Sequence, residues 1–282
     1  MDDCFAVPTA PADTRRASLT DRVAGQAVME HLLALQQDVP PRSAVARALG
    51  VSPLDEERAA WYRGALGEAA VGRLLEKLPE GWAVLHAVPV GKGDSDIDHV
   101  VIGPGGVFTI NTKNHSGQKV WVAGRTFMVN GQKQPHLRNA GHEAQRASRL
   151  LSAAAGFDVH VVPVIAVVDP ASLTMRERPE QVVVLTSSQL IRWLKKRPAT
   201  LAPEQVRALL DVSVDPAAWH ASPAPGREPA AVRSSFSALD LQVRHARRTR
   251  RALACGLLGA GGLAAVTSGP SLLTAFLTRL VT

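Results

Sequence analysis

The chain has 282 residues, of which 46% are hydrophobic and only 4% aromatic, so one or two domains must build their cores mainly from Val, Leu, Ile and Ala. Its net charge is +7, but most of this charge comes from arginines that flank the last apolar segment, so it does not predict a broad surface for phosphates. The two cysteines, Cys4 and Cys255, lie at opposite ends, which excludes a disulfide framework and a paired-cysteine zinc site.

The N-terminal third predicts a disordered start followed by helices. Residues 1–17 are rich in Pro, Ala, Thr and Asp, which predicts disorder, and they contain no apolar segment typical of a secretory signal peptide. We expect a helical extension over residues 18–60 because apolar residues recur there at helical spacing. Its helices are expected at 18–37 and 42–49, with a third running over 54–78.

A block rich in β-branched residues follows and carries the signals of a sheet. Strands are expected at 82–90, 96–102, 107–113, 119–122, 126–129, 160–168 and 181–186. Helices are expected at 139–155, 190–196 and 203–210. The run 160–168 is almost continuously apolar, which is typical of a strand buried on both faces. The order of helix, three strands, helix and strand predicts an α/β fold with a mixed sheet between helices.

The chain beyond this block predicts a linker and a membrane segment. We assign the main domain to residues 61–200, a short helical segment to 201–220 and a linker rich in Pro, Ala and Ser to 221–243. Residues 244–282 are then a basic flank and a membrane anchor, since 252–278 carry no charge and exceed the about 20 residues that cross a bilayer.

The arginines before this segment set the expected orientation. They predict a single-pass protein of the cell membrane whose main domain faces the cytoplasm. Because Ser268, Gly269 and Pro270 interrupt the segment, two short helices lying on the membrane are the alternative. The basic run Arg244–Arg251 fits anionic lipid or, as a second interpretation, nucleic acid.

Small residues recur every four positions within the uncharged segment. A stripe with this spacing permits close helix–helix approach, and self-association is therefore a hypothesis. The alternative is that the stripe merely reflects an alanine-rich composition. Its members are Ala252, Gly256, Ala260 and Ala264.

Polar side chains on two neighbouring strands form the candidate site. Asp96 and Asp98 share one face of their strand, while Asn111 and Lys113 share a face of the next. Such a pair of strands can bring Asp98 and Asn111 around a divalent cation, with Lys113 orienting or deprotonating the attacking water. The same residues also have a structural interpretation, as solvated strand ends and an edge lysine.

The same motifs resemble a known family, the nuclease-related domain (NERD). The resemblance covers about residues 60–200 and implies a restriction-endonuclease-like αβββαβ core of the PD-(D/E)xK superfamily. It also implies magnesium-dependent cleavage of DNA, with RNA as a further possible substrate. The matching positions are Gly67–Glu68, Asp98, the hairpin Gly103–Gly106, Asn111–Gly117, Asn139 and Gln145.

One position departs from the pattern of that superfamily. Asn111 stands where the pattern has Asp or Glu, and a neutral amide brings no charge to a metal. The resemblance makes Asp98, Lys113 and Glu68 the catalytic residues, Asp98 and Asn111 the ligands of Mg²⁺, and Asp96 and Gln145 possible auxiliaries. The alternative function is a catalytically degenerate fold that binds nucleic acid or protein at the membrane. In a third interpretation the helices before residue 50 recruit a partner.

Overall fold

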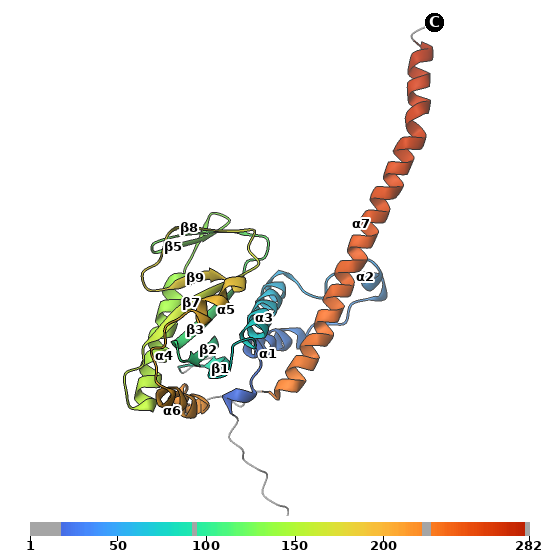
Figure 1. Ribbon diagram of the computed structural model, residues 1–282. Coiled ribbons are helices and arrows are strands. Elements are labelled where there is room, and N and C mark those ends of the chain that lie inside the picture. Colours follow the sequence, from blue (N-terminus) through green and yellow to red (C-terminus); the bar gives the residue numbers. More distant parts are fainter. Residues whose placement is uncertain (1–17, 92–94, 222–226, 280–282) are drawn as a thin grey trace, which may run out of the picture. The chain divides into compact units, whose positions relative to one another are not determined.

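The computed structural model describes residues 18–91, 95–221 and 227–279, with side chains described as far as residue 255 (Figure 1). Contacts divide the chain into two compact units. The first, here the sheet unit, contains residues 1–27 and 64–229, and the second, here the helical unit, contains residues 28–63 and 230–282. The expected disorder of residues 1–17 lies outside the described part of the chain.

The sheet unit is built on a five-stranded mixed sheet in the order β1-β2-β3-β7-β9. The first three strands are antiparallel neighbours, whereas β3, β7 and β9 run parallel. Together with the helices this confirms the predicted mixed α/β fold. The strands are β1 (Ala83–Pro89), β2 (Asp96–Gly103), β3 (Gly106–Asn114), β7 (Val161–Val168) and β9 (Val183–Thr186).

A second, four-stranded sheet in the order β6-β5-β4-β8 was predicted only in part. Its strands are β4 (Lys119–Ala123), β5 (Thr126–Val129), β6 (Gln132–Gln134) and β8 (Ser172–Glu177). The sequence did not indicate β6 and β8, because most of their side chains are exposed and the apolar alternation is weak. The buried side chains of β4 and β5 pack with Leu137 and Ala140 and with the end of β7.

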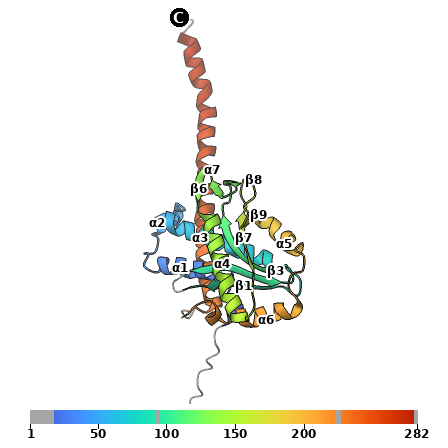
Figure 2. The same ribbon diagram turned by 90° about the vertical axis from the view of Figure 1, so that its left-hand side faces the viewer.

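Helices cover both faces of the five-stranded sheet (Figure 2). Helix α3 (Glu56–Leu75) and helix α5 (Ser187–Lys195) pack on one face, against Val101, Phe108 and Ile110. Helix α4 (His136–Ala155) and helix α6 (Pro203–Ser213) pack on the other, against Val100 and Ile102. The helix–strand order from α3 to β7 is therefore αβββα, with β4–β6 inserted before α4, and then β. Two 3₁₀ turns, Leu19–Asp21 and Pro216–Ala218, complete the sheet unit.

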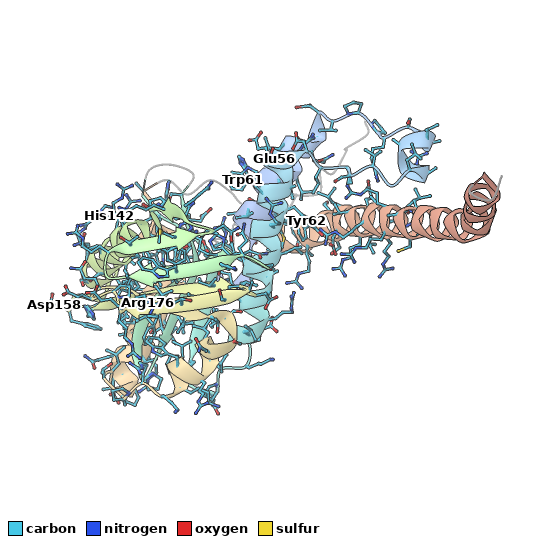
Figure 3. All side chains as sticks on the ribbon, turned by 90° about the horizontal axis from the view of Figure 1, so that it is seen from above. Glu56, Trp61, Tyr62, His142, Asp158 and Arg176 are labelled. Atoms are coloured by element: carbon cyan, nitrogen blue, oxygen red, sulfur yellow. The ribbon has the colours of Figure 1, made fainter. Side chains whose placement is uncertain are left out.

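The helical unit contains α1 (Gln26–Gln37) from Val28 onward, α2 (Ala44–Ala48), the start of α3 and α7 (Pro229–Arg279). Its packing corrects the prediction of a linker over residues 221–243, because α7 already begins at Pro229. Buried apolar side chains recur at helical spacing in this stretch, and composition alone concealed them. They are Val232, Phe236, Leu239, Val243 and Ala246. Tyr62, labelled in Figure 3, donates a hydrogen bond of 2.5 Å to Asp240 of α7.

The membrane crossing predicted for residues 252–278 finds no support in the described residues. Among them, no helix is both long enough and apolar enough to cross a membrane. The side chains of residues 256–282 lie outside the description, and they include Gly256, Ala260 and Ala264 of the stripe predicted for self-association.

Candidate functional site

The site begins where strands β2 and β3 separate. Their backbone pairing runs from Gly103–Gly106 as far as His99–Ile110. Past that point the backbone N–H of Thr112 donates to Oδ2 of Asp98 at 2.6 Å. The Asp98 carboxylate is thus the acceptor where a backbone carbonyl of β2 would accept in a continued strand pair. This hydrogen bond fixes Asp98 at the opened end of the strand pair, where the sequence predicted it.

Asn111 brings an acid that the sequence analysis missed into this site. Its side chain is only 9% exposed, and its Nδ2 donates a hydrogen bond of 2.9 Å to Oε2 of Glu143 on α4. The other oxygens of the pair, Asn111 Oδ1 and Glu143 Oε1, are buried without a hydrogen-bond partner. Two buried acceptors without donors are costly, so they indicate a place where a cation or a water belongs.

A signal for Glu143 was present in the sequence. It is the only acidic residue of α4, and it lies within the stripe of small residues by which that helix packs on the sheet. Three members of the stripe, Ala140, Ala144 and Ala147, are buried. A single acid beside such a stripe is directed toward the core rather than toward water.

Glu68 reaches the site because α3 approaches β3 closely at Gly67. A Cβ atom at position 67 would lie 2.9 Å from Cβ of Asn114 and 3.5 Å from Cγ2 of Thr112, so a larger residue would push the helix away. The next residue, Glu68, is only 7% exposed and interacts electrostatically with Asp98 and Lys113. The small residue at position 67 thus has a packing reason.

The three carboxylates destabilise one another's charged forms. Burial, and then the nearby charge of Asp98, raise the pKa of Glu68 well above its usual range. The same two causes raise the pKa of Glu143 to about 8, and burial raises the pKa of Asp98. The Lys113 ammonium opposes all three shifts. One lysine cannot neutralise three acids that are partly or fully buried, so the site favours a further positive charge.

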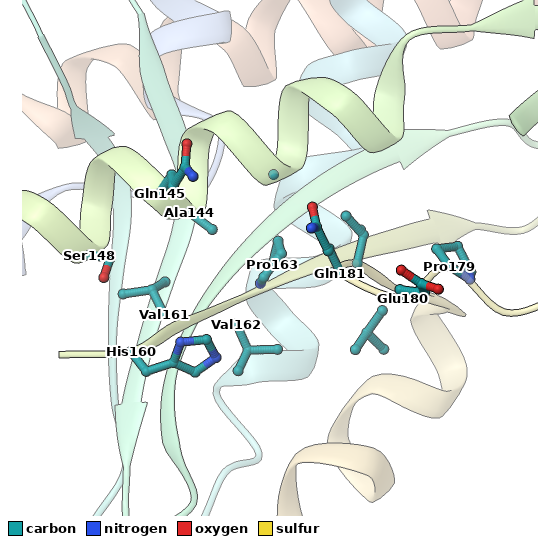
Figure 4. Close-up of a pocket in the computed structure, with 13 residues that line it drawn as sticks. Ala144, Gln145, Ser148, His160, Val161, Val162, Pro163, Pro179, Glu180 and Gln181 are labelled. Carbon is teal, nitrogen blue, oxygen red and sulfur yellow. The ribbon is translucent and has the colours of Figure 1, made fainter. Parts of the chain in front are cut away.

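The structure places the two predicted auxiliaries outside this cluster of side chains. Asp96 lies 3.6 Å from the Arg22 guanidinium, which also donates to the carbonyl of Ala87. Gln145 is exposed on α4 and lines a groove of about 480 Å³ with Ser148 and His160 (Figure 4). Asp96 still raises the pKa of Glu68 electrostatically.

Two histidines lie beside Lys113. The rings of His115 and His136 are stacked with centroids 5.6 Å apart, and both contact Phe127 of the second sheet. Burial lowers the pKa of His115, and burial followed by the charge of Lys113 lowers that of His136 to about 3. Their Nε2 atoms are buried without a hydrogen-bond partner. At neutral pH this wall of the site is therefore uncharged.

A second histidine pair, on strands β1 and β2, lies on the face of the sheet that α3 covers. The Nδ1 atoms of His86 and His99 are 2.8 Å apart, and Nε2 of His99 lies 3.3 Å from Oγ1 of Thr112. Burial lowers the pKa of His86 to about 4 and that of His99 well below its usual range. Thr112 thus links this pair to the strand segment that holds Asp98.

Comparison with known proteins relates part of the chain to one family. An uncharacterized protein of Bacillus anthracis is 45% identical over 67 residues, which is 22% of this chain and 30% of the relative. The chain thus spans about a third of the length of that curated relative. No solved structure matches the chain. Residues 63–168 match the family model of the nuclease-related domain, a segment that includes Glu68, Asp98, Lys113 and Glu143.

Proposed function

We propose that the nuclease-related domain hydrolyses phosphodiester bonds of DNA with Mg²⁺ as its cofactor. The observation that carries this proposal is the 2.9 Å hydrogen bond between Asn111 and Glu143. It supports a site in which an acid on α4 supplies the carboxylate that the strand lacks at position 111. In this proposal the site still has a second acid beside Asp98, but that acid is Glu143 on α4 instead of a residue at position 111 of β3.

The donor atoms fit a hard divalent cation. Mg²⁺ prefers oxygen ligands, and we assign Asp98, Glu143 and the amide oxygen of Asn111 as the residues that would hold it. The unpartnered Asn111 Oδ1 and Glu143 Oε1 support this set. In the described residues no group of three or more His, Cys, Asp or Glu converges on a metal position. Bound Mg²⁺ would supply neutralisation of phosphate charge and acidification of a water.

The remaining residues have distinct roles in this proposal. Lys113 orients the attacking water and stabilises charge on the phosphate. Glu68, whose pKa is raised by burial, holds or releases a proton beside the reacting groups as an auxiliary acid. Thr112 keeps the Asp98 carboxylate in place through its backbone N–H.

We also propose that the chain is attached to the cell membrane through residues 252–278, with the sheet unit on the cytoplasmic side. The uncharged stretch and the arginines before it support this attachment. Self-association through the small residues of the same segment remains a hypothesis.

Cleavage of plasmid and single-stranded DNA by the full chain in detergent, with Mg²⁺ or Mn²⁺, tests the enzymatic proposal. Cleavage that is lost in Asp98→Ala supports it. A folded protein that neither cleaves nor binds either metal would instead favour a binding module of the same fold. The neutral side chain of Asn111 is the feature that favours this second function.

A further inference from the structure

In the helical unit, the segment around α2 is fixed against α7. Gly50 follows α2 with a φ of +67°, and a Cβ there would lie 2.7 Å from both the carbonyl oxygen of Ala246 and the nitrogen of Arg250. Arg42 donates to the carbonyl of Val51 at 2.6 Å and to Oε1 of Gln242 at 3.4 Å. The segment 42–51 therefore has a defined position on residues 242–250 of α7.

This arrangement presents large apolar side chains to solvent. Val45 is 68% exposed, Leu49 56%, Val51 47% and Leu253 43%. Val45 on α2 and Leu49, the residue that caps the end of α2, are four positions apart in the chain. Leu253 is one turn beyond Arg250, which α7 brings close to Gly50. We refer to Val45, Leu49, Val51 and Leu253 as the α2–α7 surface. Clustered exposed apolar side chains of this size mark interaction sites.

The same part of α7 is strongly basic. Besides Arg244, which pairs with Asp240, four arginines are exposed there, and the described stretch 241–255 contains no acidic residue. The last acid before it, Asp240, is already engaged by Tyr62 and Arg244. These four exposed arginines are Arg247, Arg248, Arg250 and Arg251.

We propose that the α2–α7 surface binds an anionic lipid bilayer, with its apolar side chains in the interface and the neighbouring arginines at the headgroups. Basic and apolar groups side by side suit this partner, because arginines attract anionic headgroups while apolar side chains insert among the acyl chains near the surface. Nucleic acid would match the arginines but leave Val45 and Leu49 without apolar partners. A second copy would oppose one set of arginines with another. The proposal is independent of the nuclease chemistry.

A fluorophore on α2 tests this contact separately from any binding through residues 252–278. Val45→Cys, in a full chain with Cys4→Ser and Cys255→Ser, is labelled with an environment-sensitive dye. It is then mixed with vesicles of phosphatidylglycerol or of phosphatidylcholine, each with and without spin-labelled acyl chains. The matched control carries the dye at Ala154→Cys, an exposed position of α4 in the sheet unit.

We expect a blue shift and acyl-chain quenching at position 45 with phosphatidylglycerol vesicles, a much smaller effect with phosphatidylcholine, and neither at position 154. Leu49→Asp should remove the shift at position 45 without changing the thermal unfolding, because Leu49 is exposed. No shift on vesicle-bound protein would overturn the proposal. So would equal shifts with both lipids, a shift with DNA alone, or a shift that depends on protein concentration without vesicles.

Discussion

Asn111 and Glu143 are joined by a hydrogen bond between Nδ2 and Oε2, although they are 32 residues apart in the chain and strands β4, β5 and β6 lie between them. Each also keeps one oxygen without a partner. This relationship makes an amide on a strand and an acid on a helix parts of one site, and it leads directly to the first prediction.

Replacing Glu143 by Gln should remove metal-dependent cleavage while preserving the fold. We expect a loss of roughly 100-fold or more in kcat/KM, or about 2.7 kcal/mol of transition-state stabilisation. Without metal, the variant should be at least as stable as the wild type, because a buried acid with a raised pKa is removed. Gln145→Ala on the same helix is the control, and it should cleave normally. Equal losses in the two variants would contradict the assignment.

Lys113→Ala should abolish cleavage without unfolding the protein. The Lys113 ammonium lowers the pKa values of Glu68, Asp98 and Glu143, so its loss should raise these values further. The three acids should then carry less negative charge at neutral pH. Plasmid cleavage and circular dichroism measure the two effects. Lys119→Ala, at an exposed lysine, is the matched control. Unchanged cleavage by the Lys113 variant would eliminate the proposed mechanism.

Mg²⁺ binding should depend on pH and release protons. Glu143 has a pKa of about 8, so at pH 7 a metal must displace a proton from it, and above pH 8 it need not. The apparent affinity for Mg²⁺ should therefore rise with pH and level off above about pH 8. Calorimetric titration in buffers of different ionisation enthalpy measures the proton release. An affinity that is flat from pH 6 to 9 would count against Glu143 as a ligand.

Acidification should destabilise the fold through the buried histidines. The pKa of His86 is lowered from 6.5 to about 4, so between these pH values the unfolded chain binds more protons than the folded one. The free energy of unfolding should thus fall as the pH drops from 6.5 to 4, by up to about 1.4 kcal/mol per pH unit for each such group.

Urea unfolding at several pH values measures this dependence. His86→Gln should show a shallower loss than the wild type, and the difference between the two profiles separates the histidine from the acids, whose raised pKa values act in the opposite sense. His142→Gln, at an exposed position of α4, should leave the profile unchanged. Parallel profiles for wild type and His86→Gln would contradict the prediction.

The positions of Asp98, Asn111 and Lys113 followed from strand alternation, because side chains on a strand alternate between faces whatever surrounds the sheet. Glu68 entered through the family resemblance, and its burial depends on the close approach at Gly67. Glu143 was missed although its place within the stripe of small residues was a signal for it, because its approach to Asn111 depends on how α4 packs on the sheet. The start of α7 was missed because the Pro-rich composition before it concealed the apolar spacing.

A pattern search that demands an acid two residues before the strand lysine would discard this chain. The pairing of Asn111 with Glu143 defines a different signature, an amide at that strand position and a lone inward-facing acid on the next helix. Proteins set aside as inactive for lack of the strand acid can be sorted again by this criterion.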